Sequence, residues 1–162
     1  MRPIDDARIR ASFINASQRE RSQITLPDLD SLDWEKLEFL GWRDAKFDNL
    51  GYVVLELDGE TTGLLLRRFS RAPNARAQCS WCNDIELPNE VVLFNTKRTG
   101  DAGRKGDTVG TLVCAHFECN VNARKRPREA YLGFDVEAAR QRRIDAMREN
   151  VERFARSIRD GR

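Results

Sequence analysis

What the sequence lacks limits the kind of protein that it encodes. Among its 162 residues, no apolar run approaches the ~20 residues that a membrane-spanning helix needs. The segment 1–6 has no apolar stretch of the kind found in secretory signals. Internal repeats and low-complexity tracts are also absent. These absences lead us to expect a soluble, cytoplasmic globular protein that does not bind a membrane.

Groups for catalysis are scarce. His116 is the single histidine, which leaves little material for acid–base or nucleophilic chemistry. A phosphate-binding glycine loop of the Walker type requires glycines between a strand and a helix. The glycines here instead cluster on an expected hairpin tip: Gly100, Gly103, Gly106 and Gly110. We therefore expect a protein that is not an enzyme and has no small-molecule substrate.

The four cysteines come in two pairs. Cys79 and Cys82 are separated by two residues, and Cys114 and Cys119 by four, with 31 residues between the pairs. Cytosolic thiols are kept reduced, which favours metal binding over disulfides. A Cys-x2-Cys turn brings two thiolates to one ion at ~2.3 Å each, and two further ligands complete a tetrahedron. The spacing predicts a closed, structural zinc site with no position for water.

Other interpretations of the cysteines stay open at this point. In one interpretation, the four thiols are buried in the core without a metal. In a second, Cys79 and Cys82 form a redox pair, although no thioredoxin-like βαβ pattern surrounds them. His116 lies between the second pair of cysteines and is an alternative ligand, or a hydrogen-bonding group near the site. Iron also suits four thiolates.

Charge is distributed unevenly along a chain whose formal net charge is only +2. Residues 26–66 carry three Lys/Arg against ten Asp/Glu, a net of −7. Residues 67–128 carry twelve against six, a net of +6. This asymmetry is typical of a binding protein with an acidic end and a basic end. Alternatively, the two segments neutralise each other within one fold.

The first third of the chain is expected to be a helical lead-in. Residues 5–16 have the pattern of a short helix, with Ile9 and Phe13 on one face. The polar segment 17–27 is expected to be a loop. Residues 31–40 have the pattern of a second helical turn that ends at Gly41.

The middle of the chain has the pattern of strands. Residues 52–57 are rich in β-branched and aromatic side chains, Asp58-Gly59 is a hairpin turn, and residues 63–67 form the returning strand. A connecting loop is expected over residues 68–78. A second pair of strands is expected over 90–97 and 108–113, joined by a polar tip.

The end of the chain has the clearest helical pattern, from residue 135 to about 159. Its apolar residues follow alternating spacings of three and four: Ile144, Met147, Val151, Phe154 and Ile158. Such a stripe packs on the rest of the chain, or alternatively on a partner or in a coiled coil. The arginines of this helix are expected on a solvated face.

These patterns together predict an α+β fold. The cysteine pairs, the hairpin between them and a short helix that supplies the last ligand form a treble-clef zinc finger, with N-terminal short helices and a long amphipathic C-terminal helix. We expect a single domain over residues 1–162. Its helical lead-in covers about 1–45, its β-rich zinc-binding core 46–125 and its C-terminal helix 135–160.

Five motifs resemble those of one known family: Leu40–Asp44, Gly51–Val54, Gly63–Arg67, Cys79–Cys82 and Cys114–Asn120. The family is the treble-clef zinc domain of the FusB-type, elongation-factor-G-binding proteins, also called the FBP domain. The resemblance covers roughly residues 4–158, with the motifs in the right order.

The resemblance implies a zinc ion at the four cysteines and binding to elongation factor G, a translation GTPase. In the resistance members, it also implies release of that factor from ribosomes stalled by fusidic acid. We expect this chain to correspond to the zinc-bearing domain, without the helical N-terminal domain of the resistance proteins. The zinc-bearing domain makes the main contact in the family, so binding is expected, while drug protection stays open.

Two basic groups are candidates for contact with a translation factor or ribosomal RNA. The first is the expected hairpin tip with Lys97, Arg98, Arg104 and Lys105. The second flanks the zinc site and could form one basic surface with the first: Arg124, Lys125, Arg126 and Arg128. Charges of this kind speed encounter and confer sensitivity to salt. The alternative is that both are solvated loops.

Three aromatic positions have structural and functional interpretations. Phe94 and Trp81 are expected in the core or beside the zinc site, with exposure as partner anchors the alternative. In the run Trp42–Asp44, Arg43 and Asp44 are expected to tie the first strand to the helical lead-in, with contact to a partner as the alternative.

Two functional hypotheses follow. In the first, the chain is a non-enzymatic protein that binds elongation factor G and shifts the population of its ribosome-bound state. In the second, it is a zinc-stabilised ribosome- or RNA-binding module, supported by the local charge of +6.

Overall fold

A computed structural model describes residues 1–69, 77–84, 90–129 and 131–161. Within these residues, one antiparallel sheet forms the centre of the molecule, in the strand order β1-β2-β3-β4-β5. Its strands are β1 (Phe39–Arg43), β2 (Leu50–Leu57), β3 (Glu60–Arg68), β4 (Val91–Lys97) and β5 (Thr108–Cys114). Most of the expected loop 68–78 lies outside the described residues.

The predicted hairpin between β2 and β3 is confirmed. Leu57 pairs with Glu60, and Asp58 and Gly59 both adopt positive φ, at 52° and 84°. These angles are the signature of the two-residue turn that matches the twist of an antiparallel pair. By contrast, β3 and β4 share only two register pairs among the described residues, Arg67 with Asn95 and Arg68 with Phe94. The sheet is therefore two parts, β1–β3 and β4–β5, joined along a short edge.

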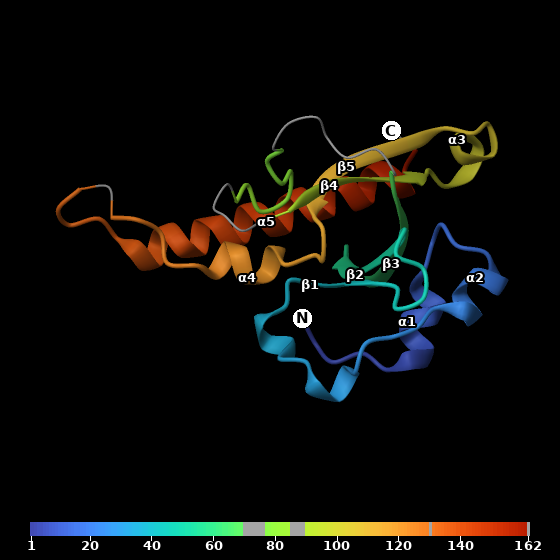
Figure 1. Ribbon diagram of the computed structural model, residues 1–162, viewed down its shortest axis with the longest axis horizontal. Coiled ribbons are helices and arrows are strands. Elements are labelled where there is room, and N and C mark those ends of the chain that lie inside the picture. The colour runs from blue at the N-terminus through green and yellow to red at the C-terminus, as the bar shows by residue number, and fades with distance from the viewer. Residues whose placement is uncertain (70–76, 85–89, 130, 162) are drawn as a thin grey trace.

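The N-terminal segment covers one face of β1–β3 (Figure 1). It contains two short helices, α1 (Asp6–Ser12) and α2 (Gln18–Gln23), and two 3₁₀ turns, η1 (Leu29–Ser31) and η2 (Trp34–Lys36). Phe13 is fully buried here, and its ring meets Tyr52 edge-on at 5.9 Å. The side chain of Asn15 joins the segment to β3, because it accepts from the Leu65 N–H at 2.9 Å and donates to the Leu65 carbonyl at 3.0 Å.

Two predictions for this segment are wrong. The expected loop 17–27 contains α2, which starts at a capping box. The Ser17 hydroxyl accepts from the Glu20 N–H, and the Glu20 carboxylate accepts from the Ser17 N–H. The Ser-x-x-Glu spacing was a readable signal for this helix. The expected second helix over 31–40 is only η2 followed by β1, and Gly41 lies inside that strand instead of ending a helix.

A long C-terminal helix covers the other face of the sheet (Figure 1). Helix α5 (Val136–Arg159) begins at Asp135, whose carboxylate caps the Ala138 N–H at 2.9 Å. The five residues of the predicted apolar stripe are all buried. Met147 and Ile158 are fully buried in the core that α5 shares with the sheet and the cysteines. The prediction that the stripe packs on its own chain is therefore confirmed.

Strand β2 is buried on both faces, which explains its nearly continuous apolar sequence. Tyr52 and Val54 point into the core under the N-terminal helices, while Val53 and Leu55 point into the core under α5. Two hydrophobic cores therefore lie on opposite sides of one sheet. Alternate residues of a strand point to opposite faces, so each core uses every second residue.

A buried carboxylate fixes the loop after β1. Asp44 accepts hydrogen bonds from the N–H groups of Lys46 and Phe47, at 2.8 and 2.9 Å, and from the Tyr52 hydroxyl at 2.8 Å. Burial acts to raise the pKa of Asp44, but these donors outweigh it and the pKa is lowered. Trp42, next to it, donates to the Thr25 carbonyl at 2.8 Å. Trp42 thus ties β1 to the N-terminal segment, and Asp44 holds the following loop to β2. Arg43, which was expected to join the strand to that segment, instead donates to the Ala115 carbonyl at 3.0 Å.

Among the described residues, none of the helices is long and apolar enough to cross a membrane. Short helices, an antiparallel sheet, a long terminal helix and a four-cysteine cluster make up the α+β, treble-clef fold that the sequence predicted.

Candidate metal centre

The first pair of cysteines lies on a tight turn that is held against β5. The Asn83 N–H donates to the Cys79 carbonyl at 3.0 Å, and Asn83 has a positive φ of 56°. Asparagine is among the few residues that tolerate this left-handed conformation. The Ser80 N–H donates to the Leu112 carbonyl at 2.8 Å, which fixes the turn on the strand. The side chains of Cys79 and Cys82 are thereby directed to one point.

The second pair spans the junction between β5 and helix α4 (Cys119–Arg124). Cys114 is the last residue of β5, and Cys119 is the first residue of α4. Between them the chain turns at Phe117, whose N–H donates to the Cys114 carbonyl at 2.9 Å and whose φ is 61°. The predicted sequence of a turn, a hairpin and a short helix that carries the last cysteine is confirmed.

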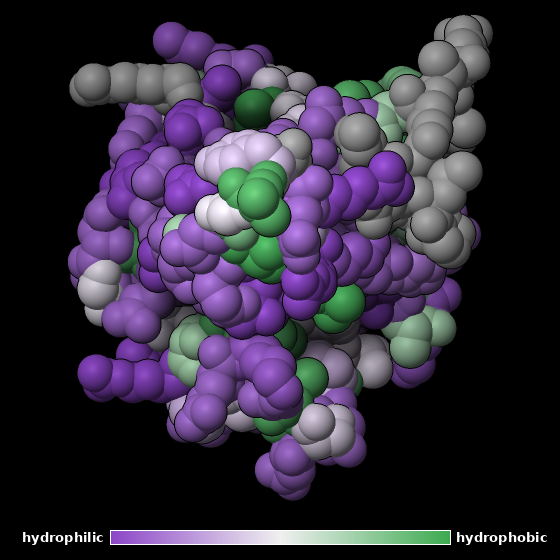
Figure 2. Space-filling view, turned by 90° about the vertical axis from the view of Figure 1, so that its left-hand side faces the viewer, coloured by the Kyte–Doolittle hydropathy of each residue, from purple (hydrophilic) through white to green (hydrophobic). Residues whose placement is uncertain are grey.

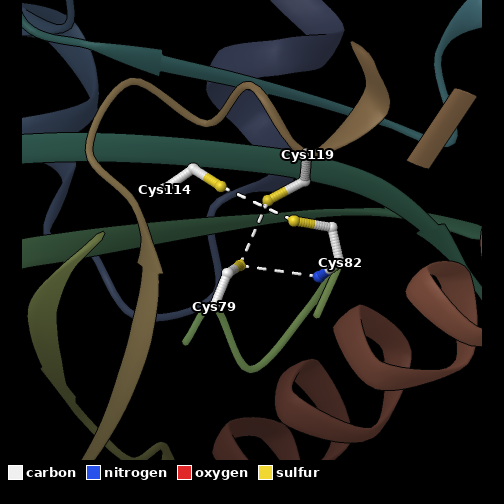
Figure 3. Close-up of side chains that lie close together, drawn as sticks. All are labelled: Cys79, Cys82, Cys114 and Cys119. Carbon is white, nitrogen blue, oxygen red and sulfur yellow. Dashed lines mark hydrogen bonds between the residues drawn. The ribbon is translucent and has the colours of Figure 1, made fainter. Parts of the chain in front are cut away.

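The four sulfurs form one compact, buried cluster (Figure 3). Sγ of Cys79 lies 3.6 Å from Sγ of Cys119, and Sγ of Cys82 lies 3.6 Å from Sγ of Cys114. All four sulfurs lie within 4.8 Å of one another, and no cysteine is more than 5% exposed. Tetrahedral zinc with Zn–S bonds of about 2.3 Å places its sulfurs about 3.8 Å apart. The cluster therefore fits a zinc ion.

The electrostatics of the cluster also call for a cation. Hydrogen bonds from the other thiols, Cys114 first, hold the pKa of Cys79 below its usual range. Hydrogen bonds with the other three thiols, Cys114 first, raise the pKa of Cys119 far above the usual value of a thiol. Four buried thiols this close cannot all ionise by themselves, because the second and later charges repel the first. A divalent cation removes that penalty and lets all four bind as thiolates.

Nearby N–H groups stabilise negative charge on the sulfurs. The backbone N–H groups of Trp81 and Cys82 point at Sγ of Cys79, at 3.4 and 3.5 Å. The Asn122 side chain donates to Sγ of Cys114 at 3.4 Å. Such outer contacts orient ligands and tune a metal site.

Phe117 connects the cluster to the sheet, and two glycines make room for it. A Cβ on Gly41 would lie 2.6 Å from the Phe117 Cβ, and one on Gly51 would lie 2.8 Å from the Phe117 Cζ. Both distances are below any real contact, so glycine is required on β1 and β2 beneath this ring. Sequence reasoning missed these roles, although glycines inside apolar strands are the known signal of a close approach.

Polar contacts also tie the second pair of cysteines to β1. The Asn120 side chain donates to the Phe39 carbonyl and accepts from the Glu38 N–H, both at 2.8 Å. Arg43 donates to the Ala115 carbonyl at 3.0 Å, and its guanidinium lies 5.6 Å from the centre of the Phe94 ring. The sheet and the metal site thus support one another.

The structure places the other predicted residues near the cysteines as follows. His116 is exposed, and its side chain is not part of the four-cysteine cluster. Trp81 and Phe94 are buried, with exposures of 1% and 0%. The Trp81 ring packs on Phe39, Phe117 and Phe154, with centroids 5.3 to 6.2 Å away. Both aromatic residues therefore belong to the core.

The two predicted basic groups lie at opposite ends of the molecule (Figure 1). The hairpin tip carries the short helix α3 (Gly100–Arg104) near the C-terminal end of α5. Arg98 is mostly buried there, forms an ion pair with Asp107 at 3.3 Å and donates to the Ser157 carbonyl. Arg104 pairs with Asp101. The tip is thus fixed to the helix, and it does not form one patch with the second group.

The second basic group follows α4. Arg124 pairs with Glu38 at 2.9 Å, and Lys125 pairs with the buried carboxylate of Asp84 at 3.0 Å. Arg126 forms an exposed pair with Glu129 at 2.7 Å. Arg124 and Lys125 therefore act structurally, because they tie α4 to β1 and to the first cysteine turn.

The chain was compared with curated proteins, solved structures and family models. No curated protein matches the chain. One solved structure that matches is titled that of the fusidic acid resistance protein FusC, with 24% identity and a TM-score of 0.48. The match covers 64% of this chain and 46% of FusC, so it spans less than half of that protein's length. The family model described as the FBP C-terminal treble-clef zinc-finger matches residues 8–158. The chain therefore belongs to the FBP C-terminal treble-clef zinc-finger family, with structural zinc as its cofactor.

Proposed function

We propose that this chain is a non-enzymatic protein that binds elongation factor G. The observation that carries the proposal is the match of the family model to residues 8–158, nearly the whole domain, with the four-cysteine cluster inside it. Five motifs of the chain, from Leu40–Asp44 to Cys114–Asn120, resemble those of elongation-factor-G-binding proteins. Because that factor works in translation, the proposal places the protein in the cytoplasm.

The zinc ligands in this proposal are Cys79, Cys82, Cys114 and Cys119. Four thiolates in a buried cluster fill the coordination shell, so the ion would act as a structural cross-link between two turns and not as a catalyst. The residues of the chain do the rest: Asn122 orients Cys114, and Asn120 and Arg43 join the site to β1. Zinc would thereby make a rigid platform out of loops that are distant in sequence.

The mechanism that suits such a platform is preferential binding. A protein that binds one conformation of elongation factor G more tightly than another shifts the population toward that conformation. If the preferred state is the free factor, ribosome-bound factor is released. If this domain alone releases the factor from ribosomes in the presence of fusidic acid, it also confers drug resistance.

Binding to ribosomal RNA is the second candidate. It is supported by the net charge of +6 over residues 67–128. The ion pairs within the described residues weaken it, because Arg98, Arg124 and Lys125 are partly buried and paired with carboxylates. Phosphate contacts require accessible positive charge and give affinity that falls steeply with salt. Elongation factor G is therefore the better-supported partner.

The test is a capture experiment with the zinc-loaded protein. Purified elongation factor G and ribosomes are offered separately at a low and a moderate salt concentration. We expect capture of the factor at both. The matched control is a variant with Cys79→Ser and Cys82→Ser, which should lose both zinc and capture, with zinc content measured alongside.

Two results would count against the proposal. Absence of factor binding at micromolar concentration in low salt would remove elongation factor G as the partner. Capture of ribosomes alone, lost as salt rises, would support the RNA-binding alternative.

A further inference from the structure

The segment that joins α4 to α5 ends in an exposed apolar turn, residues 131–134, called the apolar turn below. Tyr131 is 68% exposed and Leu132 is 104% exposed, so Leu132 makes almost no contact with its own chain. The Phe134 N–H donates to the Tyr131 carbonyl at 3.1 Å, and Gly133 has a positive φ of 83°. A glycine of this φ is typical of the third position of a tight turn. The turn therefore has a defined shape with leucine at its tip.

Aromatic packing supports this shape. The rings of Tyr131 and Phe134 meet edge-on, with centroids 5.4 Å apart and an interplanar angle of 86°. Figure 2 looks onto the end of the molecule that carries the turn and shows a small apolar cluster surrounded by hydrophilic residues. Turn tips normally carry polar residues, because they face water. Single exposed apolar side chains are ordinary. An exposed leucine on a turn that is fixed by the Tyr131–Phe134 ring contact is a typical anchor for a partner.

A groove lies directly beside the apolar turn. It has a volume of about 500 Å³ and runs between the first cysteine turn and α5. Its apolar lining includes Pro127, Phe134, Ala139 and Ala146. Phe134 belongs to both features, so the turn and the groove form one continuous surface. We call the two together the docking surface.

The rim of the docking surface is positively charged. Residues 124–143 contain seven Lys/Arg against three Asp/Glu. Four of the seven are in ion pairs, Arg124, Lys125, Arg126 and Arg140, so the charge offered to a partner comes from the arginines that line the groove. Arg143 lines the groove and is held by the carbonyls of Asn122 and Lys125, at 3.1 and 3.4 Å. Arg142 lines it too, is exposed, and forms no ion pair with any residue that the structure describes. Its charge is available to a carboxylate from outside.

We propose that the docking surface is where this chain contacts elongation factor G, through an acidic segment of that factor. Leu132 enters an apolar hollow of the partner, the partner's chain lies along the groove, and its carboxylates pair with Arg142 and Arg143. The inference rests on the proposed function and names the contact surface that it leaves open. It selects the end of the molecule opposite the β4–β5 tip.

Two features favour a protein over RNA or a lipid surface. The Tyr131 ring is packed edge-on with Phe134, and the tip itself is Leu132, which has no flat ring, whereas bases bound by proteins stack on aromatic or guanidinium planes. The groove is a concave feature that an extended peptide segment fills and that a flat bilayer does not. An acidic protein segment with an apolar anchor satisfies both.

The experiment measures the dissociation constant between elongation factor G and zinc-loaded variants of the full chain. Leu132→Asp removes the anchor and is expected to weaken binding about tenfold or more. Arg142→Glu reverses the rim charge and is expected to weaken it about threefold to tenfold, with a smaller dependence on salt. Both side chains are exposed, so zinc content and melting temperature should match the wild type.

Matched controls place the same kinds of change elsewhere. Phe47 is 56% exposed outside the docking surface, and Arg104 lies on the β4–β5 tip. Phe47→Asp and Arg104→Glu should change the dissociation constant by less than about twofold, because neither residue reaches the docking surface.

The outcomes separate the two proposals. If the wild type does not bind elongation factor G, the proposed function fails, and this inference fails with it. If the wild type binds and Leu132→Asp and Arg142→Glu bind as well, only the docking surface is wrong. Phosphatidylserine vesicles and ribosomal RNA are offered in parallel. Leu132→Asp could lose binding to the vesicles or to the RNA and still bind elongation factor G as the wild type does. That result would overturn the inference in favour of the ligand whose binding was lost.

Discussion

The contact between Gly41 and Phe117 offers a sharp test of how the metal site is joined to the sheet. Gly41→Ala adds one methyl group to β1. That methyl group would lie 2.6 Å from the Phe117 Cβ and 2.9 Å from its Cγ. These atoms are at the root of the side chain, so a change of rotamer cannot move them away. The chain between Cys114 and Cys119 has to shift instead.

The size of the effect follows from the distances. Ordinary carbon–carbon contact needs about 3.5–4.0 Å, so Phe117 must move by about 1 Å. Overpacking of this kind costs about 1–3 kcal/mol. Phe117→Gly by itself removes both the Cβ and the buried ring and should cost about 3–5 kcal/mol. In the double variant neither the Phe117 Cβ nor its ring is there to meet the new methyl group. The sum of the two single-variant costs should therefore exceed the cost of the double variant by about 1–3 kcal/mol.

The assay is denaturant unfolding of the zinc-loaded protein, combined with a chelator competition that reports zinc retention. Gly110→Ala is the matched control, because Gly110 is also in a strand. Its added Cβ would lie 3.3 Å from the movable end of Leu93 and at an ordinary contact distance of 3.5 Å from the Phe94 carbonyl oxygen. It should change stability by less than about 0.5 kcal/mol. We expect Gly41→Ala both to unfold at lower denaturant and to release zinc faster.

Equal stability of Gly41→Ala and wild type would refute the reasoning. Strict additivity in the double variant would do the same, because it would show that the methyl group and the Phe117 side chain do not meet.

Three further predictions concern the core, a buried carboxylate and the metal. Met147→Ala should cost about 2–5 kcal/mol in denaturant unfolding, because Met147 is fully buried under the sheet, while Glu149→Ala on the exposed side of α5 should change stability by less than about 0.5 kcal/mol. Asp44→Asn should cost about 1–3 kcal/mol at pH 7, because the ionised form of Asp44 accepts three hydrogen bonds. Since the pKa of Asp44 is lowered in the fold, this stability is present above the unfolded pKa of about 3.9 and is lost as the pH falls through the folded pKa. The gap between wild type and Asp44→Asn should therefore close in acid, and a gap independent of pH would contradict the assignment. Removal of zinc by a chelator should speed hydrogen exchange in the cysteine turns and in α4 before it affects the core under α1, because that core contains no cysteine. Uniform loss of protection would show that the two cores do not unfold separately.

Several features were predictable because the residues that make them are close in sequence. The Cys-x2-Cys spacing, the Asp58-Gly59 turn and the apolar stripe of α5 each depend on the geometry of a few consecutive residues or helical turns. The capping box at Ser17 belongs to the same class, and the helix after it was missed although its signal was present.

The sequence by itself determined the four cysteines as a set, the hairpin at Asp58-Gly59 and the long amphipathic helix, because local periodicity, turn chemistry and ligand spacing depend on bond geometry alone. Only the tertiary structure decided that Gly41 lies in a strand beneath Phe117, and that the two basic groups lie at opposite ends. It also decided that Arg124 and Lys125 are tied to Glu38 and Asp84. These outcomes depend on which distant segments pack together, and neither a local pattern nor a sum of charges contains that information.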